Sequence, residues 1–183
     1  APDMALLDTD KSRNLSEKNL VADINEYVEK DDSFEKDDYL PVFYEQGEYE
    51  NGKLFALPAY GTTQVMYYNK AAFEKAGIDP ATIKTWQDLA AAAEKMTASD
   101  GSFVGWEPMW GSGNLIDAAL SNGASLLSED GKKVMINSDE WVEVWESFRT
   151  WIHDDKIMKV NSGGQGWEYW YTTIDDVLQN KAG

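Results

Sequence analysis

The run from Val65 to Met96, VMYYNKAAFEKAGIDPATIKTWQDLAAAAEKM, contains residues typical of the beginnings and ends of helices, at unusually close spacing. Its first four residues are apolar or aromatic on both faces, as in a strand that is covered on both sides. Asn69 then caps a short helix, and Gly77 ends that helix in the left-handed conformation. Thr85 caps a second helix, with Asp88 in the third position of a capping box. The run therefore predicts one strand followed by two helices.

Strand-like and helix-like segments alternate along the rest of the chain, so we predict the α/β class. Short apolar runs predict strands at 4–7, 53–57 and 133–136, the last two beside Asn-Gly and Asp-Gly turns. Residues 8–14, DTDKSRN, only faintly match a calcium loop and are interpreted as a solvated loop. Apolar residues at spacings of three and four predict the remaining helices. These run from a cap at Ser16 to Val28, over 115–120, from Ser138 through Trp141, Val144, Trp145, Phe148, Trp151 and Ile152, and from Thr172 or Thr173 through Ile174, Val177 and Leu178.

The composition excludes several function classes. Of the 183 residues, 43% are hydrophobic and 13% aromatic, including eight Trp, so the chain is expected to fold. The net charge of −17 argues against general binding to nucleic acids and against docking on anionic membranes. The chain has no Cys, which excludes disulfides, thiol catalysis and Cys-ligated zinc. The first residues already resemble a strand, and the last residues follow a helix with no closing element, so we expect a fragment of a longer protein.

Catalytic motifs are absent from the sequence. The single His, His153, lies at the polar end of a predicted helix, and there is neither a phosphate-binding loop nor a nucleophile elbow. Adjacent carboxylates such as Asp175 and Asp176 are interpreted as solvated faces. Glu107 and Glu168 are flanked by Trp residues, and a glycoside hydrolase would need two such carboxyls about 5–10 Å apart across a sugar. We expect no catalysis, no metal and no cofactor.

Aromatic residues in polar loops suggest a ligand cleft. Residues 106–114, WEPMWGSGN, place two Trp in a loop of small and polar residues, where an indole could stack on a sugar ring while neighbours bond its hydroxyls. The alternative is that both rings only anchor the loop to the body. Residues 167–171 and 60–63 offer two further walls, the latter with a Gly that would let a ligand approach the backbone. The candidate ligand-binding residues are Tyr60, Gly61, Thr62, Thr63, Trp106, Glu107, Trp110, Ser112, Asn114, Trp167 and Tyr169.

Three motifs carry a resemblance to a known family. Tyr68-Asn69-Lys70, Phe73 to Pro80 (FEKAGIDP) and Thr85 to Leu89 (TWQDL) follow one another without a gap apart from a spacer. This pattern closely resembles the extracellular solute-binding proteins of ABC importers, in the carbohydrate-binding group that includes the maltose-binding and glycerol-3-phosphate-binding proteins. Ala1-Pro2-Asp3 and the segment from Asp176 to Gly183 resemble flanking parts of the family pattern, with Asn180 in place of a family Gly.

The resemblance implies a two-lobed, type II periplasmic-binding-protein fold that closes on its ligand about a hinge. Residues 1–61 would belong to lobe one, and 62–183 would form most of lobe two. Residues 61–63 match a segment that often touches ligand, and 106–110 falls where the family places stacking aromatics. The implied protein is an extracytoplasmic monomer, periplasmic or lipid-anchored on the outer face of the cell membrane. It would capture a carbohydrate and deliver it to an ABC importer permease.

Three alternatives remain open from the residues alone. A polyol-phosphate ligand such as glycerol 3-phosphate would require a cation or a helix N-terminus in the cleft. The only arginines, Arg13 and Arg149, lie outside the candidate walls, which favours a neutral sugar. A glycoside hydrolase would require Glu107 and Glu168 to face each other, and a protein-interaction module would leave the Trp residues unaffected by small ligands.

Overall fold

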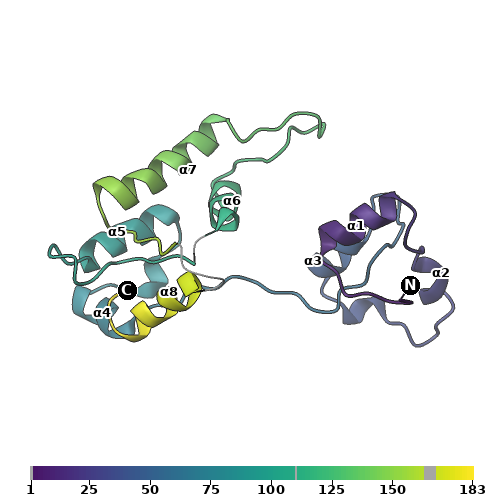
Figure 1. Cartoon of the computed structure of the whole chain (residues 1–183), viewed down its shortest axis with the longest axis horizontal. Helices are drawn as coiled ribbons and strands as arrows, with labels where there is room; N and C mark the ends of the chain where they lie inside the picture. Colours follow the sequence, from purple (N-terminus) through teal and green to yellow (C-terminus); the bar gives the residue numbers. More distant parts are fainter. Residues whose placement is uncertain (1, 110, 163–167) are drawn as a thin grey trace. The chain divides into compact units, whose positions relative to one another are not determined.

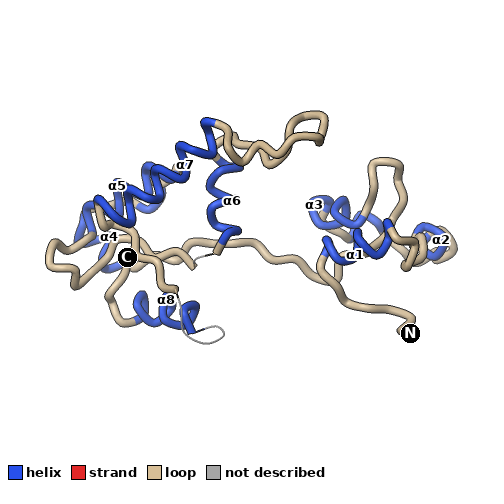
Figure 2. The backbone as a smooth tube through the Cα atoms, turned by 45° about the horizontal axis from the view of Figure 1, so that its top comes forward, coloured by secondary structure: helices blue, strands red, loops and turns tan. Residues whose placement is uncertain are grey.

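The computed structural model describes residues 2–109, 111–162 and 168–183, with Ser112 described by its backbone alone. It divides into two compact units, Ala1–Val65 and Met66–Gly183, which we describe separately (Figure 1). Figure 2 shows the described chain as helices and loops, without a strand.

The first unit is built from short helices. Its core contains the buried residues Tyr44, Leu54 and Phe55. The predicted turn at 51–52 is confirmed: Gly52 has a φ of +82°, and an antiparallel bridge joins Glu48 to Leu54. The helical elements are α1 (Thr9–Glu17), α2 (Asn25–Val28), η1 (Lys36–Asp38), α3 (Pro41–Tyr44) and η2 (Glu45–Gly47).

Two predictions for this unit are wrong. Most of the stretch interpreted as a solvated loop is helix α1, because the Asp8 carboxylate accepts a hydrogen bond from the Lys11 backbone N–H at 2.8 Å and caps it. The single helix predicted to start at Ser16 does not form, and Ser16 is instead a buried residue near the end of α1. The Asp8 cap also places Asp10 in the first turn of α1, where a negative charge is favourable.

The second unit holds the longer helices. The predicted caps at its start are confirmed: Asn69 Oδ1 accepts from the Ala72 N–H at 3.1 Å, and Gly77 has a φ of +66°. Thr85 and Asp88 form the predicted capping box. The elements are α4 (Lys70–Ala76), η3 (Pro80–Thr82), α5 (Trp86–Met96), α6 (Ser112–Ser121), α7 (Asp139–Arg149), the single π-helical turn η4 (Thr150–Asp154) and α8 (Glu168–Leu178).

Two details of the later helices differ from the predictions. Trp145 is 53% exposed, whereas Trp141, Val144 and Phe148 are buried, because a spacing of three and four residues leaves Trp145 at the edge of the apolar stripe. The last helix begins at Glu168, so the Thr residues at 172 and 173 lie inside α8 and do not cap it.

The core of the second unit is aromatic. Trp106 lies against Trp86, Phe148 and Trp151, with ring centroids 5.7 to 5.9 Å from its own. Two of these contacts are edge-to-face, the arrangement that aromatic quadrupoles favour. Helices α5, α6 and α7 contribute most of the other buried residues.

Three extended segments meet beside this core. Parallel bridges join Trp106 to Met158 on one side and Val104 to Ala182 on the other, so 104–106 is the middle segment. A Cβ added to Gly105 would lie 2.1 Å from the Ala93 carbonyl oxygen, which shows how closely α5 packs on this backbone. The α/β pattern is therefore present as short parallel bridges.

The other predicted strands are extended but unpaired over most of their length. Met4 is 90% exposed and Tyr67 is 80% exposed, so neither the segment at 4–7 nor that at 65–68 is covered on both faces. A strand is stabilised by hydrogen bonds to neighbouring strands, and no β-ladder forms among the described residues. The predicted hairpin at 130–131 does form, with an antiparallel bridge between Leu127 and Val134.

Candidate functional site

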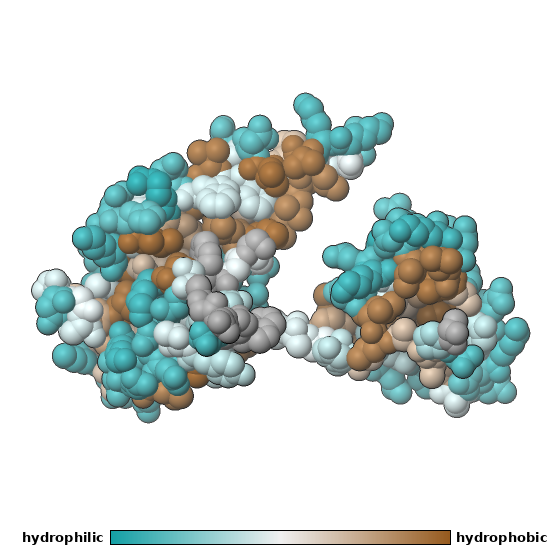
Figure 3. Space-filling model, in the orientation of Figure 1, coloured by the Kyte–Doolittle hydropathy of each residue, from teal (hydrophilic) through white to brown (hydrophobic). Residues whose placement is uncertain are grey.

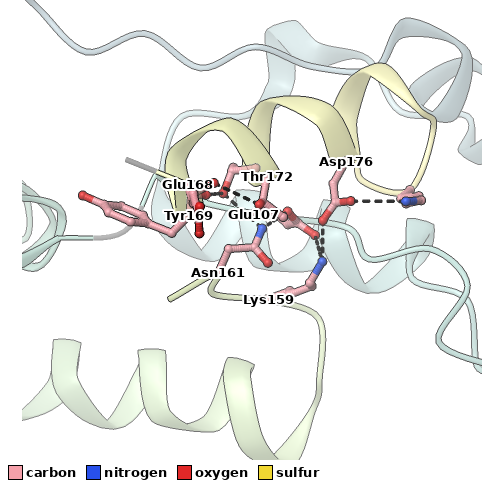
Figure 4. A network of polar contacts seen from close by, with 9 residues as sticks. Glu107, Lys159, Asn161, Glu168, Tyr169, Thr172 and Asp176 are labelled. Carbon is pink, nitrogen blue, oxygen red and sulfur yellow. Dashed lines mark hydrogen bonds and ion pairs between the residues drawn. The ribbon is translucent and has the colours of Figure 1, made fainter. Parts of the chain in front are cut away.

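Glu107 lies at the centre of a polar network in the second unit (Figure 4). It directly follows Trp106 in the middle extended segment, and only 1% of its side chain is exposed. Its Oε1 lies 3.0 Å from the Lys159 Nζ, and its Oε2 accepts a hydrogen bond from the Asn161 amide at 2.9 Å. Both carboxylate oxygens are therefore engaged by groups more than 50 residues away in the chain.

Helix α8 supplies the opposite side of the network. Asp176 Oδ2 accepts from the Lys159 ammonium at 2.5 Å, and its Oδ1 lies 3.7 Å from the Lys181 Nζ. The Asn161 amide also donates to the Thr173 hydroxyl at 3.1 Å. Only 8% of the Asp176 side chain is exposed. Lys159 thus joins one carboxylate from the middle extended segment to one carboxylate from α8.

Local periodicity explains why these side chains converge. The Lys159 N–H donates to the Trp106 carbonyl at 3.0 Å, which holds the two extended segments side by side. Lys159 and Asn161 are two residues apart, so they share one face of an extended segment. Thr173 and Asp176 are three residues apart on α8, so they share one face of the helix. The Thr173 hydroxyl is further held by donation to the Tyr169 carbonyl at 3.2 Å.

Burial and pairing shift the pKa values in this network. Burial raises the pKa of Glu107, although Lys159 and Asn161 oppose that shift. Burial also acts to raise the pKa of Asp176, but Lys159, Asn161 and Lys181 outweigh it, so the pKa of Asp176 is lowered. For Lys159 burial acts to lower the pKa, and the two carboxylates outweigh it and raise it. The network therefore holds a buried ion pair whose charges depend on one another.

Trp106 is a core residue. It is 6% exposed and packs against three aromatic rings, although its neighbours in the sequence are small and polar. This placement supports the alternative in which the ring anchors its loop to the body. The loop's other indole, Trp110, lies outside the described residues, and so does Trp167.

The other candidates of the second unit lie at helix starts. Asn114 is in the first turn of α6 and is half-buried, while the Ser112 side chain is not described. Tyr169 is half-buried in the first turn of α8, and Glu168 before it is exposed. Figure 4 shows the Tyr169 ring extending away from the Glu107 network, so the ring and the network lie apart.

The candidate segment 60–63 belongs to the first unit. All four residues are exposed, and Tyr60 is 75% exposed. A Cβ added to Gly61 would lie 2.3 Å from a ring carbon of Phe43. The Gly therefore makes room for an aromatic ring of its own unit, which the sequence did not reveal.

Sequence reasoning missed four members of the network, namely Lys159, Asn161, Thr173 and Asp176. The interpretation of Asp176 as part of a solvated face is wrong, because the residue is 6% exposed. The signal that could have found it is its position three residues after Thr173 and four after Thr172, with Val177 beside it on the inward side of the helix. Nothing in the sequence pairs Asn161 with Glu107, 54 residues earlier.

A separate open groove of about 590 Å³ lies elsewhere on the second unit, between the first residues of the unit, α4 and the start of α5. Its walls are partly apolar, and none of the candidate ligand-binding residues lines it. The lining residues are Met66, Tyr68, Phe73, Pro80, Ile83, Lys84, Thr85, Trp86, Gln87, Leu89, Ser121 and Asn122.

Two kinds of feature are absent from the described residues. In residues 2–109, 111–162 and 168–183, no group of three or more His, Cys, Asp or Glu side chains could hold a metal ion. Over the same ranges no helix has the length and apolar character that a membrane crossing requires.

Comparison with known proteins gives consistent matches. The sequence model of a family described as bacterial extracellular solute-binding protein matches residues 1–183. An arabinooligosaccharide-binding protein of Bacillus subtilis (strain 168) is 27% identical over 151 residues, covering 82% of this chain and 34% of that protein. The sn-glycerol-3-phosphate-binding periplasmic protein UgpB of Yersinia pestis is 47% identical over 62 residues, covering 33% of this chain and 14% of that protein.

A solved structure shares the fold. An ABC substrate-binding protein from Listeria monocytogenes, in complex with cycloalternan, superposes with a TM-score of 0.70 at 24% identity. The match covers 94% of this chain and 43% of that one. The two-lobed α/β fold predicted from the sequence is thus confirmed, and this chain spans well under half the length of the relatives that it matches.

Proposed function

Because the chain belongs to the family of bacterial extracellular solute-binding proteins, we propose that it is part of the solute-capture subunit of an ABC importer that binds a carbohydrate. The family match over residues 1–183 is the observation that carries this proposal. The sugar-related names of the Bacillus and Listeria proteins support the choice of ligand class.

The polar network of the second unit suits a sugar ligand. Glu107 and Asn161 are held in fixed orientations by Lys159 and Thr173. Groups with fixed orientation discriminate among hydroxyl patterns, because a wrongly placed hydroxyl leaves a desolvated partner unpaired. We propose that this network fixes the geometry of lobe two's share of the ligand site, with Tyr169 at the start of α8 and Asn114 in the first turn of α6 as further ligand contacts.

The remaining candidates keep the roles predicted from the aromatic loops and from the resemblance. We propose that 1–61 belongs to lobe one and 62–183 to lobe two, with residues 60–63 as a ligand-touching segment. Trp110 and Trp167 are the proposed stacking rings, since Trp106 is engaged in the core. The proposed protein is extracytoplasmic and monomeric, and it delivers its solute to a membrane permease.

We propose that the chain does not catalyse hydrolysis. A glycosidase would need Glu107 free to donate or accept a proton, with a second carboxyl across the sugar. Here the ammonium of Lys159 and the amide of Asn161 occupy both oxygens of Glu107. Binding without turnover is what a capture subunit requires.

A second candidate, a polyol-phosphate ligand, is favoured by one observation. Over 62 residues the chain is 47% identical to UgpB of Yersinia pestis, whose name records sn-glycerol-3-phosphate binding. That stretch covers only 33% of this chain, whereas the Bacillus match covers 82%. We therefore place the carbohydrate ligand first.

Tryptophan fluorescence tests the proposal directly. The chain would be titrated with arabino-oligosaccharides, malto-oligosaccharides and sn-glycerol 3-phosphate. We expect a saturable spectral change with a neutral oligosaccharide, and we expect Asn161→Ala to weaken it at least about tenfold by removing a fixed hydrogen-bonding group. Asn122→Ala, at the end of α6 and outside the network, is the matched control and should bind as the unaltered chain does. No response to any member of the panel would contradict the carbohydrate proposal.

A further inference from the structure

The strongest unexplained feature is that the cation in the candidate site already has two anionic partners. Lys159 Nζ lies 3.0 Å from Glu107 and 2.5 Å from Asp176, and these two carboxylate side chains are only 1% and 8% exposed. The Lys159 side chain as a whole is 47% exposed. A solute could reach Lys159, but the positive charge of Lys159 is already neutralised by carboxylates of the protein.

From this geometry we infer that the network is charge-compensated and selects an uncharged solute against a phosphorylated one. The inference deepens the proposed function and rests on it, since it names the ligand class for the same site. Phosphate groups are bound in proteins by cations or helix N–H groups that are available to them. In this network an anion would meet a cation that two buried carboxylates already hold.

The carboxylates are not free to move aside. Glu107 also accepts from Asn161, and Asp176 also lies 3.7 Å from Lys181. A phosphate that displaced either carboxylate from Lys159 would separate a buried negative charge from its nearest cation, which is a large cost. Repulsion between the phosphate and the two carboxylates acts in the same direction.

Among the described residues, one further cation lies at the edge of the network, and it too is paired. Lys181 is already directed at Asp176. The one arginine of the unit, Arg149, pairs with Glu146 and Asp154 on and beside α7. Residues 110 and 163–167, which lie outside the described residues, include no Lys or Arg in the sequence, so they add no positive side-chain charge.

The test follows the ε-carbon of Lys159 by NMR in the full chain with 13C-labelled lysine, with the signal assigned through its loss in Lys159→Met. Inorganic phosphate and sn-glycerol 3-phosphate are titrated into the unaltered chain and into Glu107→Gln/Asp176→Asn. We expect no saturable shift in the unaltered chain, and an apparent phosphate Kd at least about tenfold lower in the double variant, because Lys159 is then unpaired.

A matched control removes the acidic partners of Arg149, a cation outside the network. Glu146→Gln/Asp154→Asn removes both ion-pair partners of Arg149 but leaves the network intact. The chemical shift of the Lys159 ε-carbon should therefore not change as phosphate is added. Saturable phosphate binding at Lys159 in the unaltered chain would overturn the inference. So would a double variant that folds, by its near-ultraviolet circular dichroism, and still ignores phosphate.

The same samples separate this inference from the proposed function. If neutral oligosaccharides bind while phosphate also shifts Lys159 in the unaltered chain, the solute-capture proposal stands and the charge inference fails. If no oligosaccharide binds but phosphate shifts Lys159 only in the double variant, the charge inference stands and the carbohydrate proposal fails.

Discussion

At the scale of single residues, Lys159 is the position on which the candidate site depends. Its ammonium pairs with both the buried carboxylate of Glu107 and that of Asp176. A buried carboxylate that loses its partner retains the desolvation cost without the compensating attraction. Loss of this ammonium should therefore lower the stability of the second unit more than loss of an exposed ion pair does.

We predict that Lys159→Met lowers the free energy of unfolding by about 1–3 kcal/mol at pH 7. Lys132→Met, which removes an exposed ion pair with Asp130 at 3.9 Å, should leave the free energy of unfolding almost unchanged. Urea unfolding followed by circular dichroism measures both variants. Equal losses in the two variants would contradict the buried role of Lys159.

The pH dependence of that loss has a definite sign. Without Lys159 the pKa of buried Glu107 rises further above 4.5, so the folded state keeps a proton that the unfolded state loses, and stability falls as pH rises. Lys159 also lowers the pKa of Asp176 below its ordinary value of 3.8, which stabilises the fold above about pH 3.8. The Lys159→Met variant loses this stabilisation. The deficit of Lys159→Met should thus shrink when urea unfolding is repeated near pH 4. A deficit that grows on acidification would refute the assignment.

At the scale of secondary-structure elements, local signals were predicted well. The caps at Asn69 and Thr85 and the turn glycine Gly77 were predicted because each depends on residues at most four apart in the sequence. The Asp8 cap was overlooked in favour of Ser16, since two capping residues eight positions apart compete for the same chain and sequence alone does not rank them.

A pair of cap variants tests the element-level account. Thr85→Ala removes the hydroxyl that accepts from the Asp88 N–H and should lower the free energy of unfolding by about 0.5–2 kcal/mol. Ser138 occupies the equivalent position before α7 but makes no side-chain cap hydrogen bond, so Ser138→Ala should cost clearly less. Equal costs in chemical denaturation would show that the cap geometry of Thr85 is unimportant.

A second pair of variants tests the packing of α5 on the middle extended segment. In Gly105→Ala the new Cβ would lie 2.1 Å from the Ala93 carbonyl oxygen, so backbone must move, at a cost of about 1–3 kcal/mol. Gly113, inside α6, has no heavy atom within 4 Å of such a Cβ. Gly113→Ala should therefore be neutral or stabilising, because Ala is the better helix former. Thermal unfolding distinguishes the two, and a harmless Gly105→Ala would contradict the close packing.

The polar network could not be predicted from the sequence in the same way. Its members lie up to 69 positions apart, from Glu107 to Asp176, and meet only because parallel bridges place 104–106 between two other segments. The aromatic loop at 106–114 did not by itself predict where its Trp side chains lie, since a Trp in a polar loop can face solvent or the core. Trp106 turned inward because Phe148 and Trp151 on the following helical segments complete its pocket.

At the scale of the whole molecule, the chain consists of two compact units joined near Val65, four residues beyond the lobe boundary that the resemblance suggests. The connecting residues are exposed, and Tyr60 and Tyr67 are 75% and 80% exposed.

Apolar side chains are also exposed on the second unit, where Figure 3 shows brown surface around α7 and the hairpin before it. They include Leu126, Leu127, Val134, Ile136 and Val142.

Limited proteolysis tests this division. Chymotrypsin should cut first at Tyr60 or Tyr67, because these aromatic residues lie in exposed, extended backbone between the units. A fragment containing residues 68–183 should accumulate, with the tryptophan emission of a buried aromatic core. Early cleavage within α5 or α7, before the connecting segment is cut, would contradict the two-unit organisation.

The most direct test of the central claim is isothermal titration calorimetry of the chain with neutral oligosaccharides, followed by mass spectrometry of the recovered ligand. The account predicts saturable binding of one neutral oligosaccharide to one site, with the ligand recovered unchanged after long incubation. Absence of heat with every member of the panel, or recovery of the sugar in cleaved form, would contradict a solute-binding protein that captures its ligand without chemistry.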